Sequence, residues 1–195
     1  MLIIKSTVLL GAIMALGFLS ACNGSGGGDG GVGKANIAAT SSYSKGALSF
    51  DYPKSWKLDE DFAMERYQMA MFDAPEDNVC IVQLQGFESD ESLLDIAQEF
   101  AKEAKVESPG LKFSHSEFGD PYEHEGFERI DEGFGVKLVG IETAMVRSYR
   151  SKVIDGQRLI LIFQYDDEAP EEIVEGFETV RKSIKVTDNK KPAQE

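Results

Sequence analysis

Two histidines and the acids around them are the residues whose types could support catalysis or metal binding. His115 and Glu117 are two positions apart, so they would share one face of a strand. Imidazole and carboxylate ligands together can hold a transition metal, and carboxylates alone can attract Ca²⁺. A second histidine lies in the acidic run that follows, which contains Asp120, Glu123, His124 and Glu125.

The spacing of these residues favours neither activity. The histidines and acids match no defined metal site, and acidic strand or loop surfaces are common. Hydrolysis needs a positioned nucleophile and base, and no serine, histidine and acid pattern of that kind is evident. We therefore expect no catalytic residue, no cofactor and no bound metal. A small-ligand or divalent-metal-binding protein remains the alternative, and an enzyme is a weaker one.

The two cysteines have different surroundings. Cys80 lies in the apolar run 79–82, which is typical of a buried strand, and a thiol there behaves as a small hydrophobic group. A reactive thiol needs exposure and a cationic neighbour to lower its pKa, and the nearby sequence supplies no such neighbour. We expect Cys80 to be inert and buried.

Cys22 closes the sequence Leu19-Ser20-Ala21-Cys22 at the end of an apolar segment. That segment follows Lys5 and is shorter than the ~20 residues that a transmembrane helix needs. Leucine, two small residues and cysteine in this order resemble the lipobox of bacterial lipoproteins. The resemblance implies a signal peptide over residues 1–21 and a lipid on Cys22. An ordinary secretory signal with a chance cysteine is the alternative.

The next residues imply a tether and a location. Residues 24–33 are almost all glycine, so we expect a flexible, lipidated linker over residues 22–42. A domain over residues 43–187 and a polar tail over 188–195 would follow. In Gram-negative lipoproteins an aspartate after the lipidated cysteine commonly causes retention in the inner membrane. Asn23 at that position implies the outer membrane, with the domain facing the periplasm.

The charge balance excludes one class of partner. The 195-residue chain has a formal net charge of −14, which becomes −15 once Lys5 is removed with the signal peptide. Such an excess of acid repels phosphate backbones and anionic lipid headgroups. We expect no binding to nucleic acid, and attachment to the membrane only through the lipid on Cys22.

One basic concentration stands out in this acidic chain. We expect its residues to balance neighbouring carboxylates, and a partner-docking site is the less favoured interpretation. The residues are Arg147, Arg150, Lys152 and Arg158.

Hydrophobic periodicity predicts the elements that position these residues. Helical spacing of apolar residues predicts a helix that begins after Ser89 or Asp90, with Leu93, Ala97, Phe100 and Ala104 on one face. The glycine-rich and acidic segment 119–135 is interpreted as a long loop or a poorly paired ribbon. Strands are predicted over residues 47–52, 62–72, 79–84 and 111–118.

The strongest local pattern is a β-hairpin. The run 139–154 meets Asp155-Gly156, which permits a type I′ turn, and the strand 159–165 follows. Residues 159–163 are apolar on both faces, which predicts a central strand covered on both sides. An amphipathic helix over residues 170–184 would supply part of that cover through Ile173, Phe177, Val180 and Ile184.

A short motif resembles a known family. Phe50-Asp51-Tyr52-Pro53-Lys54-Ser55-Trp56 resembles the F-x-Y-P-x-x-W opening of the PsbP/Mog1-like superfamily, and the order of elements is similar over residues 43–186. The superfamily includes DcrB-like and LpqN-like bacterial lipoproteins. The resemblance implies an α/β/α sandwich of the α+β type, built on a mainly antiparallel sheet. Understood members act mostly by binding other macromolecules. The favoured hypothesis is therefore a lipid-anchored envelope module that binds a protein and does not catalyse.

Overall fold

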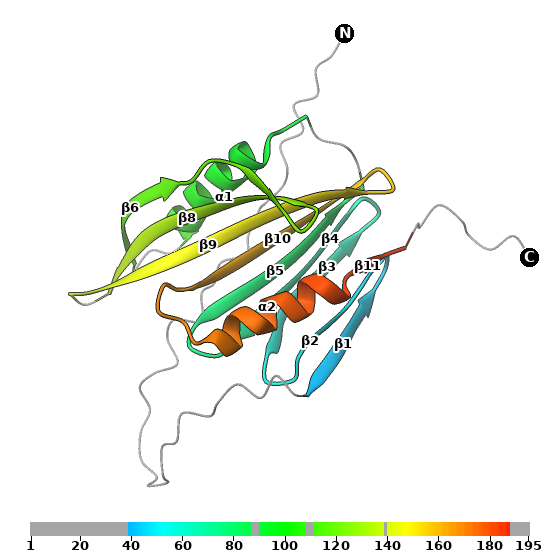
Figure 1. The fold of residues 1–195 in the computed structure, drawn as a ribbon, viewed down its shortest axis with the longest axis horizontal. Helices are drawn as coiled ribbons and strands as arrows, with labels where there is room; N and C mark the ends of the chain where they lie inside the picture. The colour runs from blue at the N-terminus through cyan, green and yellow to red at the C-terminus, as the bar shows by residue number, and fades with distance from the viewer. Residues whose placement is uncertain (1–38, 87–89, 108–110, 139, 188–195) are drawn as a thin grey trace, which may run out of the picture.

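The computed structural model describes residues 39–86, 90–107, 111–138 and 140–187 (Figure 1). The predicted signal peptide 1–21, Cys22 and the tail 188–195 lie outside these residues, and the predicted linker 22–42 is described only from residue 39 onward. Within the described ranges, no helix is both long enough and apolar enough to cross a membrane.

Two antiparallel sheets form the framework of the domain. The larger sheet has eight strands in the order β3-β4-β5-β10-β9-β8-β6, with β7 also paired to β8, and the smaller sheet has the order β1-β2-β11. The strands are β1 (Thr40–Lys45), β2 (Leu48–Pro53), β3 (Lys57–Met64), β4 (Tyr67–Ala74), β5 (Asn78–Gln85), β6 (Lys112–Phe118), β7 (Tyr122–His124), β8 (Phe127–Leu138), β9 (Ile141–Ile154), β10 (Gln157–Asp166) and β11 (Lys185–Val186).

Two helices cover opposite faces of the larger sheet. Helix α2 (Glu171–Ser183) and the smaller sheet lie on one face, and helix α1 (Leu93–Glu107) lies on the other (Figure 1). Each helix contributes the apolar residues expected from its periodicity: Leu93, Ala97 and Phe100 from α1, and Ile173, Phe177 and Val180 from α2. The predicted fold class, an α/β/α sandwich on a mainly antiparallel sheet, is confirmed.

Strand β10 lies at the centre of the sheet and is buried on both faces. Leu159, Leu161 and Phe163 belong to the core on the α2 face, whereas Ile160 and Ile162 belong to the core on the α1 face. Consecutive side chains of a strand point to opposite faces, so this apolar run needs cover on both sides. The hairpin prediction is also confirmed, because Asp155 and Gly156 have φ angles of 50° and 74°.

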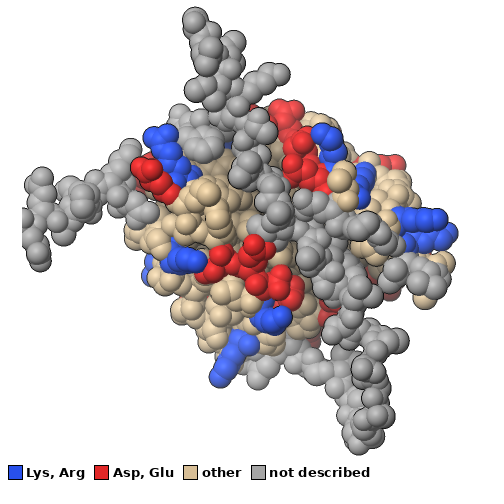
Figure 2. Space-filling model, turned by 180° about the vertical axis from the view of Figure 1, so that it is seen from behind, with Lys and Arg blue, Asp and Glu red and all other residues tan. Residues whose placement is uncertain are grey.

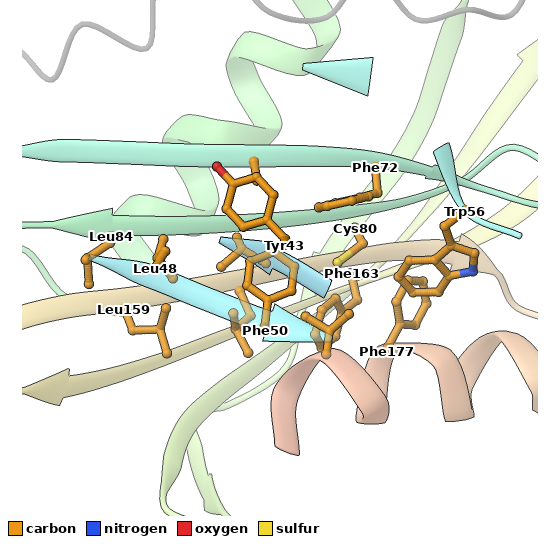
Figure 3. Packing of buried hydrophobic residues seen from close by; sticks show 14 of the residues in the cluster. Tyr43, Leu48, Phe50, Trp56, Phe72, Cys80, Leu84, Leu159, Phe163 and Phe177 are labelled. Atoms are coloured by element: carbon orange, nitrogen blue, oxygen red, sulfur yellow. The ribbon is translucent and has the colours of Figure 1, made fainter. Parts of the chain in front are cut away.

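The motif at residues 50–56 packs the smaller sheet against α2. Phe50 stacks on Tyr43 with ring centroids 4.9 Å apart, and Trp56 contacts Phe177 at 5.2 Å (Figure 3). The Trp56 amide donates a hydrogen bond to the Pro53 carbonyl at 3.0 Å, and this bond closes the turn from Pro53 to Trp56. The role of the motif is therefore to hold the core together.

Cys80 is part of the same core. It is fully buried on β5, and Figure 3 shows it among the aromatic side chains of this face. Burial raises the pKa of its thiol well above the usual value, which keeps the group protonated. The prediction that Cys80 is buried is confirmed, and burial supports the expectation that its thiol is inert.

Gly176 on α2 allows the helix to approach the motif closely. A Cβ atom at this position would lie 2.6 Å from Trp56 Cζ2 and 3.1 Å from Pro53 Cγ. Gly176→Ala should therefore destabilise the domain by about 1–3 kcal/mol through overpacking, although the same change stabilises an unobstructed helix by about 0.5–1 kcal/mol. Urea denaturation measures the change. Glu175→Ala, at an exposed position of the same helix, is the control, and a Gly176→Ala protein more stable than wild type would contradict the packing.

Three predictions from the sequence differ in detail from the structure. Residues 119–121 lie outside any strand, but the rest of the predicted loop or poorly paired ribbon over 119–135 is mostly strand, and β8 pairs with β9 from Glu128 to Leu138 without interruption. Crowding accounts for Gly135 in β8, because a Cβ there would lie 2.1 Å from Ser114 Oγ. The strand predicted over 62–72 is a hairpin of β3 and β4, in which Met64 pairs with Tyr67. Its turn contains no glycine, proline or asparagine that would indicate a turn in the sequence.

The described domain begins with β1 at Thr40, before the expected start at residue 43.

Candidate functional site

An apolar pocket lies on the α1 face of the larger sheet, beside the last turn of the helix. The pocket has a volume of about 290 Å³. Ala104 closes the side next to the helix, and strand side chains form the walls. The main wall residues are Phe113, Phe134, Val136 and Met145, and the first two stack with ring centroids 6.1 Å apart. We call this cavity the α1-end pocket.

The pocket forms because strands β8 and β9 extend past the last turn of α1. In β8, Ile130 and Phe134 point to the α1 face, and in β9 Met145 and Tyr149 do so. Ile130 and Tyr149 form a core with the apolar residues of α1. The same strand faces continue past the last turn of the helix, and there they line the pocket instead.

Arg147, which belongs to a buried ion pair, forms the floor of the pocket together with Gln164. Arg147 on β9 and Glu132 on β8 are 2% and 1% exposed, and Arg147 Nη1 lies 2.8 Å from Glu132 Oε2. Arg147 also donates to Gln164 Oε1 from Nε at 3.0 Å and from Nη2 at 2.6 Å. Its guanidinium lies 4.4 Å from the centroid of the Phe134 ring and 5.2 Å from that of Phe100.

The partners of Glu132 complete this network. Its carboxylate accepts hydrogen bonds from the hydroxyls of Tyr149 at 2.9 Å and Ser116 at 2.6 Å, in addition to the bond from Arg147. Burial raises the pKa of Tyr149, so the phenol stays protonated and acts as a donor. Buried charges are tolerated when they are paired and hydrogen-bonded in this way. The polar groups of the floor are therefore engaged within the domain, and the apolar walls remain for a ligand.

Acidic residues lie at the rim of the pocket. Glu76 and Asp77 occupy the β4–β5 turn with φ angles of 62° and 59°, and Asp166 ends β10. Asn78 holds this rim in place, because its side-chain amide donates to the Pro75 carbonyl and its Oδ1 accepts from the Asp166 amide. The rim is thus fixed by one hydrogen bond across the β4–β5 turn and one between β5 and β10.

The histidines considered for metal binding are exposed and lie apart from one another in the fold. His115 and Glu117 are on β6, whereas His124 is on β7, where its Nε2 lies 3.8 Å from Glu125 Oε2. In the part of the chain that the structure describes, no group of three or more histidine, cysteine, aspartate or glutamate side chains is placed to hold a metal ion.

The structure brings together a serine, a histidine and an acid that no sequence pattern indicated as a cluster. Ser114 Oγ donates to Glu142 Oε1 at 2.7 Å and lies 3.2 Å from His115 Nδ1. A hydrolytic triad places histidine between serine and acid, so that the base accepts the serine proton. Here serine lies in the middle, and its proton is directed to the carboxylate. This order of contacts does not activate the hydroxyl.

The predicted basic concentration is divided between the two faces of the sheet. Arg147 belongs to the pocket floor, whereas Arg150 pairs with Glu178 of α2 at 2.7 Å and its guanidinium lies over the Phe163 ring. Burial by itself raises the pKa of Glu178. The hydrogen bonds from Arg150 and Arg181 together lower it by more than burial raises it, so the net pKa is below the ordinary value. The prediction that these cations balance carboxylates is confirmed for Arg147 and Arg150.

The two remaining basic residues line a polar hollow of about 370 Å³ at the hairpin end of the domain. Lys152 lies over the Phe127 ring, and Arg158 donates to Ser151 Oγ at 2.9 Å and to the Glu91 carbonyl at 2.6 Å. Glu123 and Glu128 also line this hollow, so it presents charges of both signs. Acidic and basic side chains are similarly interspersed on the face of the molecule drawn in Figure 2.

Comparison with known proteins gives likenesses of structure alone. No family model and no curated protein matches the chain. Similar solved structures include the cyanobacterial PsbP protein CyanoP from Synechocystis sp. PCC 6803, with 20% identity and a TM-score of 0.46 over 83% of this chain and 98% of that one. Another is LpqN of Mycobacterium tuberculosis, described as involved in cell envelope biogenesis, with 17% identity and a TM-score of 0.39 over 72% and 83% of the two chains.

A third similar structure is a protein from Bacteroides thetaiotaomicron, with 11% identity and a TM-score of 0.42. The match covers 74% of this chain and 47% of that one, so it spans about half of the longer protein. At these identities the likeness concerns the fold.

Proposed function

We propose that this chain is a lipid-anchored protein of the bacterial envelope that binds another protein through the α1-end pocket and does not catalyse a reaction. The pocket itself is the observation that carries the proposal. Its walls are apolar, and the polar groups of its floor are engaged within the domain. Protein interfaces concentrate their binding energy in pockets of this kind, where an aromatic or aliphatic side chain of the partner is fully desolvated.

The proposed anchor would increase the effect of a weak interaction. A lipid on Cys22 followed by a flexible linker would confine the domain to the membrane surface, with a reach that grows as about 5–6 Å times the square root of the linker length. Confinement raises the effective concentration of the domain towards other envelope proteins. A pocket that accepts a single side chain would then be sufficient for a functional contact.

Binding of a small molecule is the second candidate. A concave apolar site with a few polar groups at its edge is also the usual form of a small-ligand site. A ligand that binds the native state raises the melting temperature, so a thermal-shift screen with metabolites and divalent metals tests this candidate. A reproducible, saturable shift with a metabolite that is lost on blocking the pocket with Thr143→Trp would favour it over the protein partner.

The anchor is tested by labelling cells with radioactive palmitate. Wild-type protein should incorporate the label and be recovered with membranes, whereas Cys22→Ala should incorporate none, because the acceptor thiol is missing. Cys80→Ala is the matched control and should label as wild type, since Cys80 is fully buried. Equal labelling of the wild type and Cys22→Ala would disprove lipidation at this residue.

A further inference from the structure

The rim of the α1-end pocket carries a charge that identifies the chemistry of its partner. We propose that the pocket recognises a protein segment in which one aromatic or long aliphatic side chain is flanked by lysine or arginine. This inference rests on the proposed function, because it names the partner of the same site. The apolar side chain would enter the cavity, and the flanking cations would meet the acidic rim.

The size of the cavity favours a single side chain. Its volume of about 290 Å³ is at the lower limit of the range of about 300–1,000 Å³ typical of sites for drug-sized ligands, and one bulky side chain can occupy such a space. The stacked rings of Phe113 and Phe134 offer a flat aromatic surface, and Met145 is a flexible side chain that adapts to the shape of its neighbour. An aromatic side chain would make the largest contact with such walls.

The charge of the rim favours a basic flank. Glu76, Asp77 and Asp166 line the opening, and none of them forms an ion pair with another described residue. Arg147 is the one cation among the described lining residues, and Glu132 neutralises it. Within the described part of the chain, the three rim carboxylates therefore present negative charge that no ion pair neutralises, beside an apolar cavity.

The nearest strand lysines do not cancel this charge. Lys112 pairs with Lys137, and the adjacent pair is Phe113 and Val136, which line the pocket. Because neighbouring residues of a strand point to opposite faces, the two lysines lie on the face away from the pocket. The chain as a whole carries −14, so long-range attraction also favours a basic segment.

Isothermal titration of the full chain in phosphatidylcholine nanodiscs tests the inference. The probe is the peptide Gly-Ser-Phe-Lys-Lys-Ser-Gly, compared with versions in which alanine replaces phenylalanine or glutamates replace the lysines. Removal of the aromatic anchor should weaken binding by about 30-fold, the loss expected for a buried hot-spot side chain. Reversal of the flanking charges should weaken it by at least about threefold at low salt and by less at high salt.

Variants of the protein assign the contacts. Thr143→Trp fills the cavity from β9 and should abolish binding. The triple variant Glu76→Gln, Asp77→Asn, Asp166→Asn keeps the shape of the rim, because asparagine tolerates a positive φ as aspartate does; it should lose the preference for lysine over glutamate. The matched control neutralises Glu65, Glu123 and Asp155, which are exposed and lie at the opposite end of the sheet from the β4–β5 turn, and should retain that preference.

The possible failures are distinguishable. Equal binding of the lysine and glutamate peptides, blocked by Thr143→Trp, would overturn the charge inference and leave the proposed pocket intact. Binding of phenethylamine as tightly as the peptide would overturn the protein segment as occupant in favour of a small cationic ligand. No binding of any aromatic peptide would overturn both the inference and the pocket as the interaction site, while the labelling experiment on Cys22 would still decide the anchor independently.

Discussion

Replacing Glu132 with alanine is expected to lower the free energy of unfolding by about 3–5 kcal/mol. The substitution leaves the Arg147 guanidinium buried without its counter-ion, and it removes the acceptor of the Tyr149 and Ser116 hydroxyls. Equilibrium unfolding in urea measures the loss. Glu117→Ala, one position before the end of the neighbouring strand β6 and exposed, is the control and should change stability by less than about 0.5 kcal/mol.

The double variant Glu132→Leu, Arg147→Met separates the cost of an unpaired charge from the value of the pair. A buried ion pair contributes little once it is compared with apolar residues of similar size, so this variant should recover most of the stability lost in Glu132→Ala. A double variant less stable than Glu132→Ala would show that the pair itself stabilises the fold, contrary to this account.

Phe177→Ala is expected to destabilise the domain by about 3–5 kcal/mol. Phe177 is 2% exposed and stacks on Phe163 of the central strand, with ring centroids 4.7 Å apart and planes inclined by 10°. It also contacts Trp56 and Tyr165, so truncation would leave a cavity between α2 and the sheet. Chemical denaturation monitored by tryptophan fluorescence would report both the stability and the environment of Trp56.

Val174→Ala provides the matched truncation on the same helix. Val174 is 40% exposed, and its loss should cost less than about 1 kcal/mol. Similar effects of the two truncations would indicate that α2 is not packed on the sheet through Phe177. A loss at Phe177 alone would support the described arrangement, in which the helix covers one face of β10 (Figure 1).

Local patterns predicted the parts of the fold that local chemistry determines. The Asp155-Gly156 turn needs positive φ angles that few residues tolerate, and the apolar run 159–163 needs cover on both faces. Strand β8 could not be recognised in the same way. A glutamate such as Glu132 is normally exposed, and it is buried here because it pairs with Arg147, 15 positions away in sequence. The burial of β8 therefore depends on a tertiary contact that hydrophobic periodicity does not reveal.

The α1-end pocket had no signature in the sequence. Phe134, Val136 and Met145 have the composition and spacing of ordinary core residues, and only the position of the end of α1 relative to the strands leaves them beside a cavity. The acidic rim is similar: Asp77 and Asp166 are 89 positions apart and meet because Asn78 bridges their segments. The proposed anchor differs from the pocket, because it is inferred from the sequence alone: the segment around Cys22 lies outside the described residues.

Site-specific photocrosslinking in cells tests the central claim, that this domain binds a protein through the α1-end pocket, most directly. A benzophenone amino acid placed at Ile141, which lines the pocket but is 73% exposed, would be compared with the same group at Asp59 on the opposite edge of the sheet. We expect one discrete protein adduct from position 141, which is lost in the Cys22→Ala background and absent from position 59. No adduct at position 141, or the same adducts from both positions, would contradict the account.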